Sequence, residues 1–107
     1  MSKAYNQKLP SAWVRRARVF TALGDEHRQR ILLLFERGKP LTIKDIVAQV
    51  PLSQTATMHH LRVLRDANVL AATKRGRSVY LRPRVPVVVE AMQGLLDYIR
   101  EEFQEPR

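Results

Sequence analysis

Two adjacent histidines, His59 and His60, stand in the stretch SQTATMHHLRVLRD between Ser53 and Asp66. Imidazole groups bind metals and transfer protons, so the pair raises the question of a metal or catalytic site. Neighbouring side chains on a helix point in different directions, however, and a chelating pair needs a spacing of three or four residues. The third histidine, His27, belongs to another predicted helix, and the chain has no cysteine. We therefore predict no metal site and no cofactor.

The same stretch separates into two faces when it is drawn as a helix with about 100° per residue. One face should point inward, with His60 as a half-buried, hydrogen-bonded residue, and consists of Thr57, His60, Leu61, Leu64 and Asn68. The opposite face should be exposed and carries amide, hydroxyl, thioether, imidazole and guanidinium groups, from Gln54, Thr55, Met58, His59, Arg62 and Arg65.

The exposed face has the chemistry that reads a DNA duplex. Gln and His side chains pair with base edges, and Met and Thr side chains pack on thymine methyl groups. Arg62 and Arg65, further along the helix, are placed to reach phosphates. An ordinary solvated helix surface is the alternative interpretation, and we favour DNA reading because of the elements around this helix.

Those elements begin with three helices bounded by capping residues and glycines. We expect the first helix over residues 11–23, capped by Ser11, and a second that starts at Asp25 and stops at Gly38. Thr42 and Asp45 resemble a capping box for a short third helix, which Pro51 ends, and Ser53 caps the helix with the two faces. Residues 42–67 therefore form a predicted helix-turn-helix.

The chain after Asn68 changes to short strand-like segments around Gly76. Residues 70–82 thus form a predicted two-stranded wing whose tip carries three cations that can contact phosphates or a narrow minor groove, namely Lys74, Arg75 and Arg77. The fold class is mainly α with a small β-hairpin: a winged helix-turn-helix of five helices and a two-stranded wing, in a single domain over residues 1–107 with an N-terminal arm at 1–10.

The last predicted helix, over residues 86–104, has one apolar side. That side carries Val88, Met92, Leu95, Leu96, Ile99 and Phe103. So small a chain buries little surface alone, which makes a homodimer plausible. Gly94 inside this helix costs roughly 1 kcal/mol relative to Ala; close helix approach at a dimer interface and simple tolerance both explain it.

Charge is distributed unevenly along the 107 residues. The chain has a formal net charge of +9, and residues 1–84 hold 17 basic and 5 acidic side chains, whereas residues 85–107 hold 2 and 5. A polyanion such as DNA is therefore the expected partner of the first part. No apolar run approaches the ~18 residues of a membrane span, so we expect a cytoplasmic protein without a membrane partner.

No arrangement of residues indicates catalysis: we find no nucleophile with a base at a meaningful spacing, no glycine-rich phosphate loop and no acidic cluster with ligand geometry. An enzyme is therefore not expected. Two other functions remain open beside sequence-specific DNA binding. One is a winged-helix module that contacts an acidic protein, and the other is a nonspecific, architectural DNA-binding protein.

Three separated segments resemble the ArsR/SmtB family of bacterial winged-helix repressors: ALGDEHRQRIL, LSQTATMHHLRVLRDANVL and GRSVYLRP. The resemblance covers about residues 13–103. It implies a repressor that binds an imperfect inverted repeat of double-stranded DNA as a homodimer. The first and last helices would form the dimer through Trp13, Ala17 and Phe20 and through the apolar side described above. Gln54, Thr55, Met58 and His59 occupy the positions of the family's base-contacting set, in which a small serine is usual where this chain has Met58.

The sequence departs from the family at its metal sites. Metal-sensing members carry a Leu-Cys-Val-Cys-Asp-Leu pattern in the third helix, and the matching residues 41–46 here read LTIKDI. The family's other site uses Asp and His from paired last helices, and this last helix offers only carboxylates, which are poor substitutes for the thiolate and imidazole donors of soft metals. We infer that cysteine-based metal sensing is lost, and the effector is not indicated by the sequence.

Overall fold

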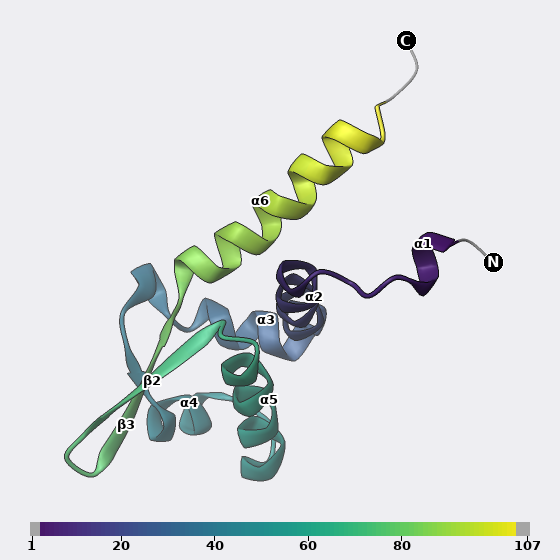
Figure 1. The fold of residues 1–107 in the computed structure, drawn as a ribbon. Coiled ribbons are helices and arrows are strands. Elements are labelled where there is room, and N and C mark those ends of the chain that lie inside the picture. The colour runs from purple at the N-terminus through teal and green to yellow at the C-terminus, as the bar shows by residue number, and fades with distance from the viewer. Residues whose placement is uncertain (1–2, 105–107) are drawn as a thin grey trace.

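The structure is a computed structural model that describes residues 3–104, and side chains from Tyr5 to Gln104. Its helices and strands occur in the order α1 (Lys3–Asn6), α2 (Ser11–Leu23), α3 (Glu26–Leu33), a 3₁₀ turn (Glu36–Gly38), β1 (Leu41–Thr42), α4 (Ile43–Gln49), α5 (Gln54–Asp66), β2 (Leu70–Arg75), β3 (Ser78–Pro83) and α6 (Val85–Glu102). The five longer helices and the β2–β3 hairpin confirm the winged helix-turn-helix (Figure 1). The short α1 lies in the predicted N-terminal arm, whose residues 1–2 are outside the described residues.

Three of the predicted helix caps are present. The side chains of Asp25, Thr42 and Ser53 accept hydrogen bonds from the backbone N–H groups of Arg28 (3.1 Å), Asp45 (3.0 Å) and Ala56 (3.1 Å). Each bond satisfies a backbone donor that a helix start leaves free. These caps define where α3, α4 and α5 begin, and so they set the helix-turn-helix.

Two predicted boundaries are wrong. Pro10, not Ser11, is the N-cap of α2, and no side chain caps this helix; proline suits a helix start because it lacks the N–H that would be left free. Helix α3 ends at Leu33 and not near Gly38, because the backbone of Phe35 turns to ψ 70° and brings its ring into the core. Arg37 and Gly38 then have positive φ, which a right-handed helix does not accommodate.

Asn68 does not lie on the inward face of α5 as expected. The helix ends at Asp66, and Asn68 takes the left-handed conformation with φ 62° and an exposed side chain. The next N–H, from Val69, then bonds back to the Leu64 carbonyl at 2.9 Å. This is the hydrogen bond of a Schellman motif, and it reverses the chain from α5 into the wing.

The sheet has three strands in the order β1–β3–β2, all antiparallel, and so contains one strand more than predicted. Leu41 pairs with Leu81 and Thr42 with Tyr80, while the hairpin is closed at Arg75 and Ser78. Gly76 at the tip has φ 60°, as the tight turn requires. The added strand joins the base of the wing to the start of α4.

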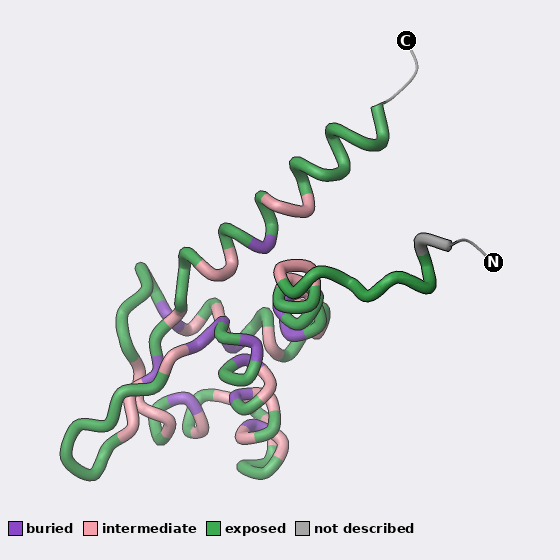
Figure 2. Tube along the Cα trace, viewed as in Figure 1, coloured by how far each residue is buried: buried purple, intermediate pink, exposed green. Residues whose placement is uncertain are grey.

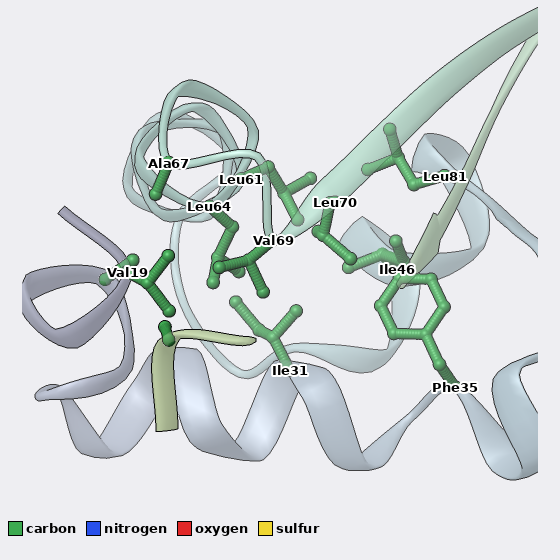
Figure 3. Packing of buried hydrophobic residues seen from close by; sticks show 12 residues of the cluster. Val19, Ile31, Phe35, Ile46, Leu61, Leu64, Ala67, Val69, Leu70 and Leu81 are labelled. Atoms are coloured by element: carbon green, nitrogen blue, oxygen red, sulfur yellow. The ribbon is translucent and has the colours of Figure 1, made fainter. Parts of the chain in front are cut away.

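The hydrophobic core lies where α2, α3, α4, α5 and the sheet meet, and it includes Ala91 of α6. Ile31 of α3 points toward Leu64 of α5 and toward Val69, and the Phe35 ring lies beside Ile46 of α4 (Figure 3). On α5, Thr57, Leu61 and Leu64 are fully buried, and the Thr57 hydroxyl donates to the Ser53 carbonyl at 3.0 Å. The predicted inward face of α5 is thus confirmed up to Leu64.

Helix α6 leaves this core and runs outward beside α2 (Figures 1 and 2). The Arg16 guanidinium of α2 bonds Glu90 of α6 through Nε at 3.0 Å and Nη2 at 2.5 Å. A Cβ atom at Gly94 would overlap that guanidinium group. Gly94 therefore leaves space for an arginine of the same chain. The sequence had suggested close helix approach at a dimer interface or simple tolerance, and neither explanation included this contact.

Arg28 of α3 connects α2 to α5. Its Nε donates to the Ala22 carbonyl at 2.7 Å and its Nη2 to the Thr21 carbonyl at 3.1 Å, both at the end of α2. Its Nη1 lies 3.2 Å from Nδ1 of His60, which confirms that His60 is half-buried and hydrogen-bonded. Because a guanidinium only donates, Nδ1 must accept and the imidazole must be neutral there.

The pKa of His60 is lowered from its ordinary value near 6.5, first by burial, with Asp25 opposing and with Arg28, His27 and His59 adding to the decrease. The folded state then binds fewer protons than the unfolded state at mildly acidic pH. The contribution of His60 to stability is complete above pH ~6.5 and is lost as pH falls through the folded pKa.

We expect urea unfolding between pH 8 and pH 5 to show this loss, and NMR titration of His60 to give a pKa below 6.5. His60→Gln keeps a neutral acceptor for Arg28 and should remove this component of the pH dependence while other groups continue to titrate. A His60 pKa at or above 6.5, or the same pH dependence in both proteins, would contradict the assignment.

Candidate nucleic-acid interface

The outward face of α5 presents the predicted reading residues to solvent. Gln54, Thr55, His59, Arg62 and Arg65 are exposed. One concavity runs along the helix, and it is lined by Gln54, Thr55, Met58, His59 and Arg62. The structure thus brings the four predicted base-contacting residues together with one guanidinium group.

Met58 differs from its neighbours because it is half-buried and packs against the core. Its side chain lies at the border of the outward face, between the concavity and the groove that separates α5 from the wing. An unbranched thioether adapts to such a position. Met58 therefore contributes to anchoring α5 as well as to its exposed surface, a double role that the helical projection did not indicate.

Helix α5 is held firmly behind its reading face. The Ser53 cap sets its first turn, Leu61 and Leu64 anchor its middle, and the neutral imidazole of His60 receives the bond from Arg28. These contacts leave Gln54 and Thr55 exposed for a partner. Such anchoring limits the motion of the exposed side chains relative to the rest of the domain.

The wing presents three exposed cations, Lys74, Arg75 and Arg77. The Arg75 guanidinium carbon lies 5.7 Å from the centre of the Tyr80 ring, a cation–π arrangement across the hairpin. Lys74 pairs with Val79 in the β2–β3 register. The basic tip therefore stands on a hairpin that extends away from the core, as Figure 1 shows.

The predicted dimer residues lie on α2 and on α6, or directly after α6. Met92, Leu96, Ile99 and Phe103 are exposed, as is Ala17, whereas Trp13, Phe20, Val88 and Leu95 are partly buried within the chain. Trp13 packs edge-on against Tyr98 with ring centres 4.8 Å apart, and Tyr98 packs likewise against Phe103 at 5.7 Å. These three residues form an aromatic cluster between the start of α2 and the end of α6.

The described residues contain no group of three or more His, Asp or Glu side chains placed to hold a metal ion. The ring centres of His27 and His60, and of His59 and His60, are each 5.6 Å apart. No helix in the described part of the chain has the length and apolar character to cross a membrane.

Comparison with known proteins identifies the chain's relatives. The profile described as "Bacterial regulatory protein, arsR family" matches residues 25–71, which run from the cap of α3 into β2. The arsenic resistance transcriptional regulator ArsR1 of Pseudomonas putida is 37% identical over 86 residues, which are 78% of this chain and 67% of that protein. The transcriptional repressor SdpR of Bacillus subtilis is 29% identical over 83 residues, which are 78% of this chain and 91% of that one.

A solved structure agrees with this similarity. An ArsR-like transcriptional regulator from Rhodococcus sp. RHA1 superimposes with a TM-score of 0.77 and 25% identity, covering 86% of each chain. The resemblance predicted from three short motifs is thereby confirmed in sequence and in fold. We conclude that this chain belongs to the ArsR family of bacterial transcriptional regulators.

Proposed function

We propose that this ArsR-family protein is a homodimeric repressor that binds an imperfect inverted repeat of double-stranded DNA. The observation that carries the proposal is the two-sided character of α5: its inner face buries Thr57, Leu61 and Leu64. Its outer face presents Gln54, Thr55 and His59 beside a basic wing. In this arrangement α5 would lie in a major groove, while the wing would contact the backbone or the adjacent minor groove.

The apolar surface of α6 supports the dimer. Met92 is 51% exposed, Ile99 41% and Phe103 63%, on a helix that extends away from the core. Burial of such side chains against a second copy removes their apolar area from water. A two-fold pair would present two α5 helices to one duplex, which is why the expected operator is an inverted repeat.

The two alternative functions have weaker support. A protein-docking surface would more often present aromatic anchors, and the exposed face of α5 has none. A nonspecific DNA-binding protein would rely on cations alone. The uncharged groups of Gln54 and Thr55 at the start of α5, ahead of its arginines, favour base reading.

The side chains of residues 41–46, in β1 and the start of α4, favour a repressor that does not sense metals there. Where metal-sensing relatives carry cysteines, this chain has Thr42 and Lys44. The Thr42 hydroxyl already accepts the capping bond from Asp45, and the Lys44 side chain is exposed. Hydroxyl and ammonium groups do not replace thiolates as ligands of soft metals.

The first experiment compares the purified protein on a duplex from the region upstream of its own gene with a scrambled duplex. Fluorescence anisotropy across a salt series should show that the upstream duplex stays bound at a salt concentration that releases the scrambled one. Equal affinities that fall together would favour nonspecific binding, and no binding to either duplex would favour the protein-contact alternative.

Gln54→Ala and Arg75→Ala should weaken binding in different ways. Loss of a base contact should cost about 1–3 kcal/mol on the operator and little on random DNA. Loss of the Arg75 charge from both protomers of the dimer should weaken binding to both duplexes and reduce the salt slope by about two. Equal losses on both duplexes for Gln54→Ala would refute base reading, and an unchanged slope for Arg75→Ala would remove the wing from the interface.

Ile99→Asp should convert the dimer to a monomer, because the interface would then bury an unpaired carboxylate. Sedimentation equilibrium measures the change directly. Leu33→Asp is the matched control, since Leu33 is 79% exposed on α3, away from α6. A wild-type monomer at the concentrations that bind DNA, or an Ile99→Asp dimer, would contradict the proposed assembly.

A further inference from the structure

A second concave surface lies beside the reading face, between α5 and the first residues of β2. It has a volume of about 580 Å³ and is floored by apolar side chains that include Leu70, Ala71 and Ala72. It shares Met58 and Arg62 with the concavity over the reading face, so the two surfaces adjoin. A duplex contacted by α5 would therefore have one of its strands near this groove.

The rim of the groove is strongly basic. It contains Arg62 and Arg65 from α5 and Arg84 from the connection between β3 and α6, with Asp66 as the one acidic side chain. All three arginines are exposed. Three guanidinium groups around a groove with small side chains on its floor complement a chain of phosphates more closely than they complement a single neutral ligand.

These arginines differ from the ones that stabilise the domain. Arg16 bonds Glu90, Arg28 bonds the end of α2 and His60, and Arg30 pairs with Glu26. Between Tyr5 and Gln104, the structure gives the guanidinium groups of Arg62, Arg65 and Arg84 no hydrogen bond or ion pair. Their charges remain available for an anionic partner.

The backbone at Arg84 is held on both sides. Its N–H donates to the Val69 carbonyl at 2.8 Å, and its carbonyl accepts from the N–H of Val87 at 3.1 Å. Residue 84 is therefore tied to the turn that follows α5 and is also the N-cap of α6. A phosphate bound there would be positioned relative to both helices.

The free edge of β2 adds possible donors. In the described sheet β2 is an outer strand, paired only with β3, so its other edge is not used for strand pairing. Ala71 and Ala72 of this strand line the groove with small side chains. Backbone N–H groups are common phosphate ligands in protein–DNA complexes.

We propose that the groove between α5 and β2 holds one sugar–phosphate strand of the bound DNA, and that Arg84 contacts a phosphate of this strand. The inference rests on the proposed DNA-binding function and adds a residue to it. Arg84 was absent from the sequence-based site because it lies between Pro83 and Pro86, outside both the predicted reading helix and the predicted wing.

The test measures the salt dependence of binding for Arg84→Gln, Arg84→Lys and Arg100→Gln. Because a phosphate contact contributes about 0.9 to the slope of log K against log salt and the proposed dimer has two Arg84 residues, Arg84→Gln should reduce the slope by about two on both operator and random duplexes. Arg84→Lys keeps the charge and should retain most of the slope. Arg100→Gln removes the same charge from the exposed end of α6 and should leave the slope unchanged.

Duplexes with a single neutral methylphosphonate locate the contact. One backbone position should weaken wild-type binding but not Arg84→Gln binding, and it should lie on the strand between the α5 and wing contacts. Unchanged slopes for Arg84→Gln, or slopes reduced equally by Arg100→Gln, would overturn the inference while wild-type binding stayed intact. A wild-type protein that binds no duplex would instead refute the proposed function, and circular dichroism with sedimentation confirms that each variant is folded and dimeric as the wild type.

Discussion

Thr57, Leu61 and Leu64 bury one face of α5 against the rest of the domain, and the other elements are arranged around this burial. Helix α5 contacts α2, α3, α4 and β2. Leu64 lies beside Ile31 of α3, and the turn that follows α5 closes through the bond from Val69 to Leu64 (Figure 3). Removing these apolar side chains from water fixes the rotation of α5 about its axis. That rotation decides which residues of α5 are exposed. The core contacts therefore determine which side chains can meet a partner.

The arginines follow the same division between internal and external roles. Arg16 and Arg28 have acceptors within the chain, the Glu90 carboxylate for one and carbonyls at the end of α2 with His60 for the other. Those on the outer face of α5, at the wing tip and at the start of α6 are exposed. The net charge of +9 alone would not separate these groups, since it counts structural and available arginines equally. Placement against an acceptor, rather than residue type, decides which charges can meet a polyanion.

Most of the fold could be predicted because its signals are local. Capping at Asp25, Thr42 and Ser53 depends on residues three apart, and the two faces of α5 follow from helical periodicity alone. Some errors were local, at the Ser11 cap and at Asn68, and others arose where distant residues decide. Strand β1 has only two residues and exists because β3 pairs with it, and α3 ends early because Phe35 turns into the core. The space at Gly94 is occupied by the Arg16 guanidinium, 78 positions away in the sequence, and the groove with Arg84 exists only once β2 lies beside α5.

Two hydrogen-bonded connections join α5 to the helices that would form the dimer. Arg28 links the last carbonyls of α2 to His60, and the Arg84 N–H links the start of α6 to Val69, the residue that ends the α5 turn. A change in the relative position of α2 and α6 therefore has to strain one of these hydrogen bonds or move α5 with it. Packed interfaces switch between discrete arrangements and do not deform continuously. An effector therefore need not contact the outward face of α5 to change the position of that face. This connectivity requires no thiolate, and the chain has no cysteine.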